Sequence, residues 1–158
     1  MCKRLFGLLL SIISTVSIIC GSVWQCSAAA LELPAVSAKA CIVMEATTRE
    51  VFFSQNADEH LPMASTTKIM TTLLCLESGD LDTPFPVDNN AIQVEGSSMG
   101  LVKDDIVTKR SLCYGMLLPS GNDAAGATAV KLAGSLSAFA DLMNERAAQL
   151  GMQNTHFV

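Results

Sequence analysis

The sequence predicts an α+β fold, with a β-hairpin near the N-terminus followed by a cluster of helices, and three observations support this prediction. Residues 40–45 and 50–54 are rich in β-branched and aromatic side chains and are separated by a short, largely polar connection, which is typical of a hairpin. Residues 69–76 form an almost continuous apolar run. Residues 135–150 carry apolar side chains at helical spacing. A chain of 158 residues is long enough for one domain with a hydrophobic core.

Residues 1–30 have the features of a secretory signal peptide. Lys3 and Arg4 give a basic start, an apolar run follows, and the small residues 27–30 would suit a signal peptidase. The apolar run is short and wrongly flanked for a membrane span. An apolar helix that stays attached is the alternative. We expect a secreted protein whose mature domain begins at residue 31 and continues to residue 158.

Removal of this segment would leave an acidic protein. The chain has ten basic and 15 acidic residues, and residues 1–30 contain two of the basic ones and no acid. Eight basic and 15 acidic residues would remain, with a net charge of −7. An acidic surface without a basic cluster argues against nucleic acid and against anionic lipid as partners.

The cysteines and histidines do not form a metal-binding pattern. Three of the six cysteines fall within the proposed signal. The others are an odd number without ligand spacing, in apolar segments, which predicts buried side chains rather than a disulfide framework: Cys41, Cys75 and Cys113. His60 and His156 are too distant in sequence to suggest a metal pair.

Turn and capping residues place the remaining elements. The apolar run of residues 69–76 should lie in the first helix. Its apolar side chains point in nearly all directions, so we expect this helix to be buried and to end at Gly79. Residues 91–94 could form a short strand. A helix over residues 109–118 should be closed by Pro119, and a small-residue helix should follow. The last helix, residues 135–150, is the clearest amphipathic one.

Ser65 and Lys68 precede the apolar run and are the first candidate catalytic pair. On one helical turn, residues three apart lie on the same face, so the hydroxyl and the amine should meet. A serine hydroxyl is a weak nucleophile until a neighbouring base takes its proton, and a lysine can do this when burial or positive potential favours its neutral form. The motif S-x-x-K is weak by itself, since a polar helix start with a solvated lysine has the same letters.

A second polar pair, Ser120 and Asn122, lies in a predicted tight turn between two helices. Both side chains could therefore project into one cleft. A hydroxyl there could pass a proton to a leaving amine, and an amide could hold a substrate carbonyl and the lysine. Asp123, the next residue, is expected to support the start of the following helix.

Four blocks of the chain together resemble the serine D-alanyl-D-alanine carboxypeptidases of peptidase family S11, which are low-molecular-mass penicillin-binding proteins. They are PMASTTKIMT at residues 62–71, GSSMGL at residues 96–101, LLPSGNDAA at residues 117–125 and LGMQNTHFV at residues 150–158. The superfamily signature is S-x-x-K followed by a serine motif and K-T-G. The resemblance implies a β-lactamase/transpeptidase-like fold.

The resemblance also implies roles and partners. Ser65 would be the acylated nucleophile and Lys68 its base, Ser120 would relay a proton, and Asn122 would contact substrate and lysine. Such an enzyme removes the terminal D-alanine from peptidoglycan stem peptides at the outer face of the bacterial cytoplasmic membrane. It is acylated by β-lactams and needs neither metal nor cofactor. The Ser65 backbone N–H would be one oxyanion-hole donor.

No K-T-G or K-S-G occurs in the chain. In the family this triad lies on a later strand, so the chain looks like an incomplete, N-terminal part of the fold, whose later sheet strands and any C-terminal membrane anchor are missing. We expect this polypeptide alone to be inactive and poorly stable, with a hairpin that lacks its sheet partners.

Two alternatives remain open. A β-lactamase would want an aspartate between Ser120 and Asn122 and a separate glutamate for deacylation, whereas Gly121 occupies that place. A secreted, non-catalytic binding or sensor domain of the same fold is the other alternative. Turnover of penicillin, as opposed to slow trapping, would identify the first, and absence of K-T-G from the intact protein would favour the second.

Overall fold

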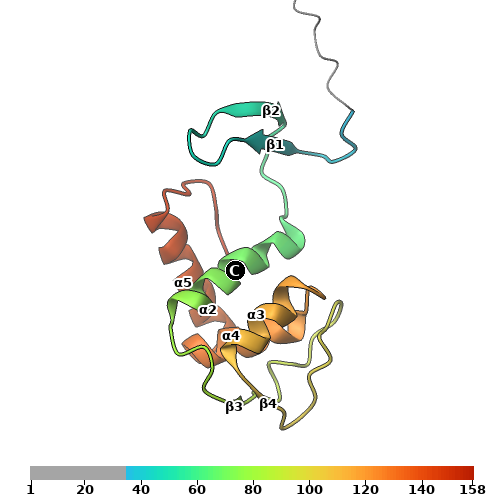
Figure 1. Cartoon of the computed structure of the whole chain (residues 1–158), viewed down its shortest axis with the longest axis vertical. Coiled ribbons are helices and arrows are strands. Elements are labelled where there is room, and N and C mark those ends of the chain that lie inside the picture. The colour runs from blue at the N-terminus through green and yellow to red at the C-terminus, as the bar shows by residue number, and fades with distance from the viewer. Residues whose placement is uncertain (1–34) are drawn as a thin grey trace, which may run out of the picture. The chain divides into compact units, whose positions relative to one another are not determined.

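The computed structural model describes residues 35–158 (Figure 1). The chain divides into two compact units, one that ends at Ala57 and one that comprises Asp58–Val158. The predicted signal peptide, residues 1–30, lies outside the described residues and remains a prediction. Among the helices that the structure describes, none is both long enough and apolar enough to cross a membrane.

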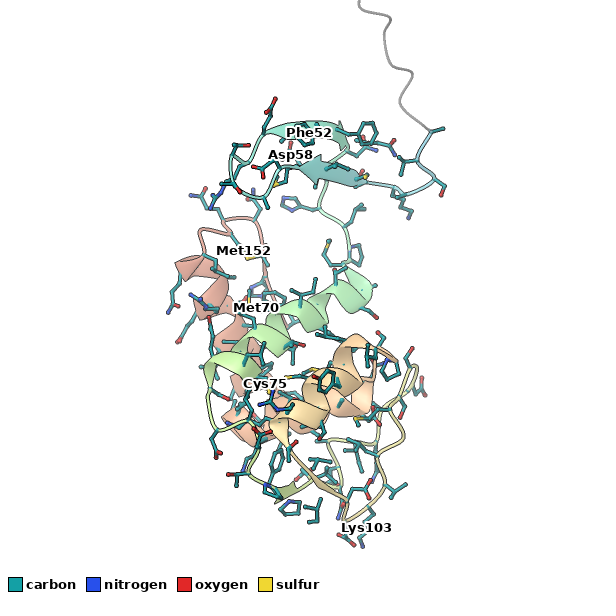
Figure 2. The ribbon with its side chains drawn as sticks, in the orientation of Figure 1. Phe52, Asp58, Met70, Cys75, Lys103 and Met152 are labelled. Atoms are coloured by element: carbon teal, nitrogen blue, oxygen red, sulfur yellow. The ribbon has the colours of Figure 1, made fainter. Side chains whose placement is uncertain are left out.

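The described part of the first unit is the predicted hairpin. Strands β1 (Cys41–Met44) and β2 (Val51–Gln55) pair antiparallel, with an irregularity between Val43 and Met44. The Glu45 carboxylate closes the turn by accepting backbone N–H groups, first of all from Thr48, and these hydrogen bonds lower the pKa of Glu45. Most of the apolar side chains of the strands are exposed, including Phe52 (Figure 2).

In the second unit, a 3₁₀ turn η1 (Ala64–Thr66) leads directly into helix α2 (Thr67–Glu77). The helix ends as expected at a glycine, since Gly79 has a φ of +63°. Burial on all sides was the wrong expectation, because Ile69 and Leu76 remain 64% and 48% exposed. Helices α3 (Lys109–Leu117), α4 (Asn122–Ala133) and α5 (Leu136–Gln149) contact α2 and cover most of its circumference. The buried residues of α2 are Lys68, Met70, Thr71, Thr72 and Cys75.

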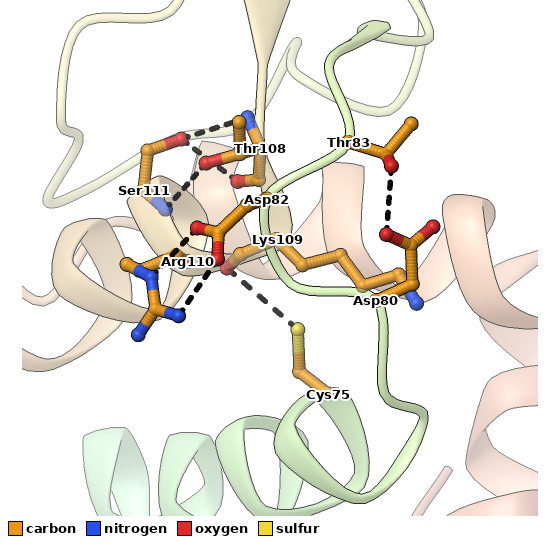
Figure 3. Close-up of polar contacts among 8 residues, drawn as sticks. All are labelled: Cys75, Asp80, Asp82, Thr83, Thr108, Lys109, Arg110 and Ser111. Carbon is orange, nitrogen blue, oxygen red and sulfur yellow. Dashed lines mark hydrogen bonds and ion pairs between the residues drawn. The ribbon is translucent and has the colours of Figure 1, made fainter.

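A small antiparallel sheet of β3 (Phe85–Pro86) and β4 (Ile106–Val107) precedes α3 (Lys109–Leu117). Thr108 caps α3, because its Oγ1 accepts the Ser111 N–H at 3.1 Å while Ser111 Oγ accepts the Thr108 N–H at 3.0 Å (Figure 3). Two of the orphan donors at the helix start are thereby satisfied. The cap fixes the start of α3, and the C-terminal end of α3 leads into the turn formed by Ser120, Gly121 and Asn122.

Residues 91 and 92 belong to a turn that begins at residue 89, and residues 93 and 94 are irregular, so the strand that the sequence allowed does not form. The Asp88 carboxylate accepts the backbone N–H groups of Asn90 and Ala91, both at 2.9 Å. This local side-chain bonding competes with strand pairing for the same N–H groups. The segment therefore crosses the surface of the unit as irregular chain.

Helices α4 (Asn122–Ala133) and α5 (Leu136–Gln149) complete the unit, and Ser135 caps α5 through the Ala138 N–H. One core cluster joins α2, α3, α4 and the small sheet: Cys75, Phe85, Val87, Val107, Leu112, Cys113, Met116, Ala124 and Ala127. A second joins α2, α4 and α5: Met70, Ala129, Phe139, Met143 and Ala147. Burial raises the pKa of the Cys75 thiol to about 12, so this residue behaves as a small apolar side chain.

Gly126 in α4 allows a close approach of the chain at Ala91. A Cβ at position 126 would lie 2.2 Å from the Ala91 carbonyl oxygen, and a backbone atom cannot easily yield. We expect Gly126→Ala to lower the free energy of unfolding by about 2 kcal/mol, although alanine is the better helix former by about 1 kcal/mol. Urea unfolding followed by circular dichroism measures the change.

Gly115→Ala is the matched comparison. The nearest obstacle to its Cβ is Met99 Sδ, also at 2.2 Å, but a flexible side-chain end can move aside. We expect a smaller loss of stability than for Gly126→Ala. Equal losses would show that contact with the Ala91 backbone is not the cause.

Candidate active site

Lys68 is the centre of a polar cluster that joins two distant segments of the chain. Its Nζ lies 2.7 Å from Asn122 Oδ1, 3.4 Å from Ser120 Oγ and 3.5 Å from Ser65 Oγ. The structure thus brings together all four side chains singled out in the sequence. The first distance is that of a strong hydrogen bond and the other two are long ones. Asn122 therefore fixes the amine, and the two hydroxyls flank it.

Ser65 lies in the 3₁₀ turn η1, immediately before α2, and not in the first turn of the α-helix as expected. The relation to Lys68 survives, because residues three apart also align on a 3₁₀ turn. The preceding residue, Ala64, has a φ of +46°, which is unusual for a residue with a Cβ. Thr66 holds this bend, since its N–H and its Oγ1 both donate to the Met63 carbonyl, at 3.1 and 2.6 Å.

The turn that carries Ser120 is also strained. Ser120 has a φ of +60°, and a non-glycine residue in this region costs about 1 kcal/mol or more. The strain is held by Pro119, which closes α3, and by a 2.8 Å hydrogen bond from the Gly121 N–H to the Gly115 carbonyl. Both serines of the cluster thus lie at sharp bends that surrounding hydrogen bonds keep in place.

Asn122 begins α4 and is held on its other side by the segment that precedes β4. Its backbone N–H donates to the Ser97 carbonyl at 2.7 Å, and its side-chain Nδ2 donates to the Glu95 carbonyl at 2.6 Å. These contacts leave Oδ1 free to face the Lys68 amine. The Glu95 carbonyl therefore sets the orientation of the side-chain amide, while the Ser97 carbonyl holds the Asn122 backbone.

The site combines a buried amine with an accessible hydroxyl. Lys68 is 8% exposed, Ser120 is half-buried, and Ser65 is exposed. All hydrogen-bond partners of the amine are neutral oxygen atoms, and within residues 35–158 no carboxylate lies at salt-bridge distance from it. Such an arrangement can exchange a proton between amine and hydroxyl while substrate reaches Ser65.

Residues 27–158 match the family model described as D-alanyl-D-alanine carboxypeptidase, Peptidase_S11. The chain belongs to the S11 family. Among curated S11 relatives, the carboxypeptidase DacF of Bacillus subtilis is 34% identical over 125 residues, which cover 76% of this chain and 32% of that protein. The carboxypeptidase of Streptomyces sp. K15 is 33% identical over 149 residues, 87% of this chain and 51% of that protein. This chain thus spans about a third to a half of these relatives.

Solved S11 structures share the architecture. The carboxypeptidase DacD from Francisella tularensis is 38% identical with a TM-score of 0.73, covering 79% of this chain and 32% of that one. The enzyme from Mycobacterium tuberculosis is 31% identical with a TM-score of 0.75, covering 82% and 48%. The expected penicillin-binding, transpeptidase-like fold is confirmed, and the hairpin and helical cluster form part of it.

Asp123 is the residue of this S11 site whose importance the sequence did not reveal. It lies in the first turn of α4 as expected, but the residue is 1% exposed and its carboxylate mainly binds the loop of residues 98–101. Burial opposes ionisation, yet the hydrogen bonds from Ser98 and from the backbone outweigh it and lower the pKa of Asp123. The sequence offers one signal of this role, the glycine-serine turn at residues 96–100, whose backbone N–H groups need acceptors.

Proposed function

We propose that the protein acts as a serine-type D-alanyl-D-alanine carboxypeptidase, secreted to the outer face of the cytoplasmic membrane. The observation that carries the proposal is the convergence of the Lys68 amine on both serine hydroxyls and on Asn122. The family of the chain and the names of its relatives support the substrate class, a peptidoglycan stem peptide ending in D-alanyl-D-alanine.

The reaction begins with proton transfer from Ser65 Oγ to the Lys68 amine, and Oγ attacks the carbonyl carbon of the penultimate D-alanine. The tetrahedral intermediate is stabilised in part by the Ser65 backbone N–H. Ser120 then relays the proton that Lys68 took from Ser65 to the departing nitrogen, the C–N bond breaks, and D-alanine leaves. Water attacks the Ser65 ester and restores the hydroxyl. Asn122 keeps the amine in place and contacts the substrate.

Gly121 supports this function over that of a β-lactamase. A Cβ at position 121 would lie 2.7 Å from Asp123 Oδ1 and 2.9 Å from the Gly115 carbonyl oxygen. An aspartate between Ser120 and Asn122, as in the β-lactamase motif, would therefore disrupt the turn. We propose that β-lactams acylate Ser65 and are released slowly.

The test of this function uses a chimera in which residues 40–158 replace the matching segment of the Streptomyces sp. K15 relative. We expect a fluorescent penicillin to label the chimera, and D-alanine to be released from a stem-peptide analogue. Ser65→Ala should abolish both, because the ester cannot form. Ser137→Ala, at an exposed position on α5, is the matched control and should change neither.

Labelling that persists in Ser65→Ala would exclude this serine as the nucleophile. A folded chimera that is never labelled would favour a non-catalytic domain of the same fold. Rapid turnover of penicillin in place of a stable adduct would favour the β-lactamase.

A further inference from the structure

Among the described residues, the Asp123 carboxylate bonds to residues 98–101 and to the Ala124 N–H and not to the side chains of the Lys68 cluster. Asp123 is nevertheless the residue next to Asn122. We propose that Asp123 is a positioning residue, which holds the loop of residues 95–101 so that the loop aims the Asn122 side-chain amide at Lys68. The proposal rests on the function above in one respect, that Lys68 serves the reaction at Ser65.

The Asp123 carboxylate holds the loop through four hydrogen bonds. Its Oδ2 accepts the Ser98 hydroxyl at 2.6 Å and the backbone N–H groups of Gly100 and Leu101 at 3.1 and 2.9 Å. Its Oδ1 accepts the Met99 N–H at 2.9 Å. Four consecutive loop residues thus donate to one buried carboxylate. Charge-assisted hydrogen bonds of this kind are the strong ones.

The same loop also contacts Asn122. The Glu95 carbonyl accepts the side-chain Nδ2 and the Ser97 carbonyl accepts the backbone N–H. The loop approaches closely because Gly96 lies between these carbonyls, where a Cβ would be 2.9 Å from Asn122 Nδ2. Gly96 also has a φ of +93°, which favours glycine.

The loop also determines which end of the Asn122 side-chain amide faces Lys68. An asparagine amide has a donor end and an acceptor end of nearly equal size. With Nδ2 bound to the Glu95 carbonyl, Oδ1 faces Lys68 at 2.7 Å. The reversed amide would place an NH₂ group against the amine and a carbonyl oxygen against the Glu95 carbonyl. The loop therefore decides which end Lys68 meets.

A plain helix-start role for Asp123 is the competing explanation. An acidic residue in the first turn stabilises a helix through its dipole, and Asp123 Oδ1 does accept the Ala124 N–H at 2.9 Å. This is the single contact of the carboxylate with α4, whereas the loop supplies four. The two explanations differ in whether the Asn122 side chain responds when the carboxylate is removed.

The test is solution NMR of the full chain with ¹⁵N-labelled asparagine. In Asp123→Asn, an NH₂ group replaces one acceptor oxygen and opposes the loop N–H donors. We expect the side-chain NH₂ of Asn122 to exchange with solvent about tenfold faster, and the Lys68 amine to react severalfold faster with an acylating reagent. Backbone exchange in α5 should be unchanged. Asp141→Asn removes the same charge at an exposed position and should affect neither group.

Two milder variants keep the test decisive if Asp123→Asn does not fold. Ser98→Ala removes one of the four loop contacts, and Gly96→Ala disturbs the approach of the loop to Asn122 while leaving Asp123 intact. Both should speed exchange of the Asn122 NH₂. Unchanged exchange in folded Asp123→Asn, or in both milder variants, would overturn the proposal. Ser65→Ala should leave Asn122 exchange unaltered, so failure of the proposed chemistry and failure of this inference are separable.

Discussion

Lys68→Met in the chimera should slow acylation by a fluorescent penicillin by about 10²–10⁴-fold, the usual contribution of a positioned general base. Methionine has a similar length and an apolar end, so it can occupy the buried site, in which Lys68 is 8% exposed. It leaves Ser65 Oγ without a proton acceptor and Asn122 Oδ1 without its 2.7 Å partner. Stopped-flow labelling measures the rate constant.

Lys103→Met is the matched control, because this lysine is exposed and its loss should leave the labelling rate unchanged. Lys68→Arg should not restore the rate, since a guanidinium does not give up its proton in proteins. A Lys68→Met protein that is labelled at the unsubstituted rate would show that another group activates Ser65.

Asp123→Ala should lower the free energy of unfolding of the chimera by about 3–5 kcal/mol, because it removes several hydrogen bonds to a charged group, each of which contributes about 1.5–3 kcal/mol. The donors are the Ser98 hydroxyl and the backbone N–H groups of the three residues that follow it. Water that enters the space would satisfy some of them, which keeps the expected total below a simple sum. Urea unfolding at pH 7 measures the loss.

The pH dependence gives an independent check of the same carboxylate. The pKa of Asp123 is lowered in the folded chain, so the unfolded chain binds the proton more readily. The stabilisation is complete above the pKa of an unfolded aspartate, about 3.9, and is lost as the pH falls through the lower folded value. The difference in urea midpoint between the unsubstituted chimera and its Asp123→Asn variant should be constant above about pH 5 and should narrow below about pH 4. A difference independent of pH would show that the Asp123 charge contributes nothing.

Local sequence predicted the hairpin, the helices and both polar pairs. The Ser65 and Lys68 pair depends only on a three-residue spacing, which brings two side chains together on a 3₁₀ turn as well as on an α-helix. Ser120 and Asn122 depend on a tight turn after Pro119. Such features are encoded within a few residues, and for this reason they were visible without a structure.

Burial of the first helix could not be predicted in this way. Its apolar residues point in nearly all directions, but the described helices leave uncovered the strip of the helix that carries Ile69 and Leu76. The pattern of a helix shows which faces can be buried, whereas the arrangement of its neighbours decides which faces are buried. Residues 91–94 are a similar case, because hydrogen bonds to the Asp88 carboxylate outweighed their weak strand propensity.

By itself the sequence determined which residues could take part in a reaction, namely a hydroxyl beside an amine and a hydroxyl beside an amide. The tertiary structure decided that Lys68 meets Ser120 and Asn122 across 52 and 54 residues of chain, and that a buried Asp123 organises the loop facing them. Contacts between distant segments arise from the packing of α2 against α3 and α4. Packing depends on the shapes of whole helices, so it cannot be predicted from the spacing of a few residues.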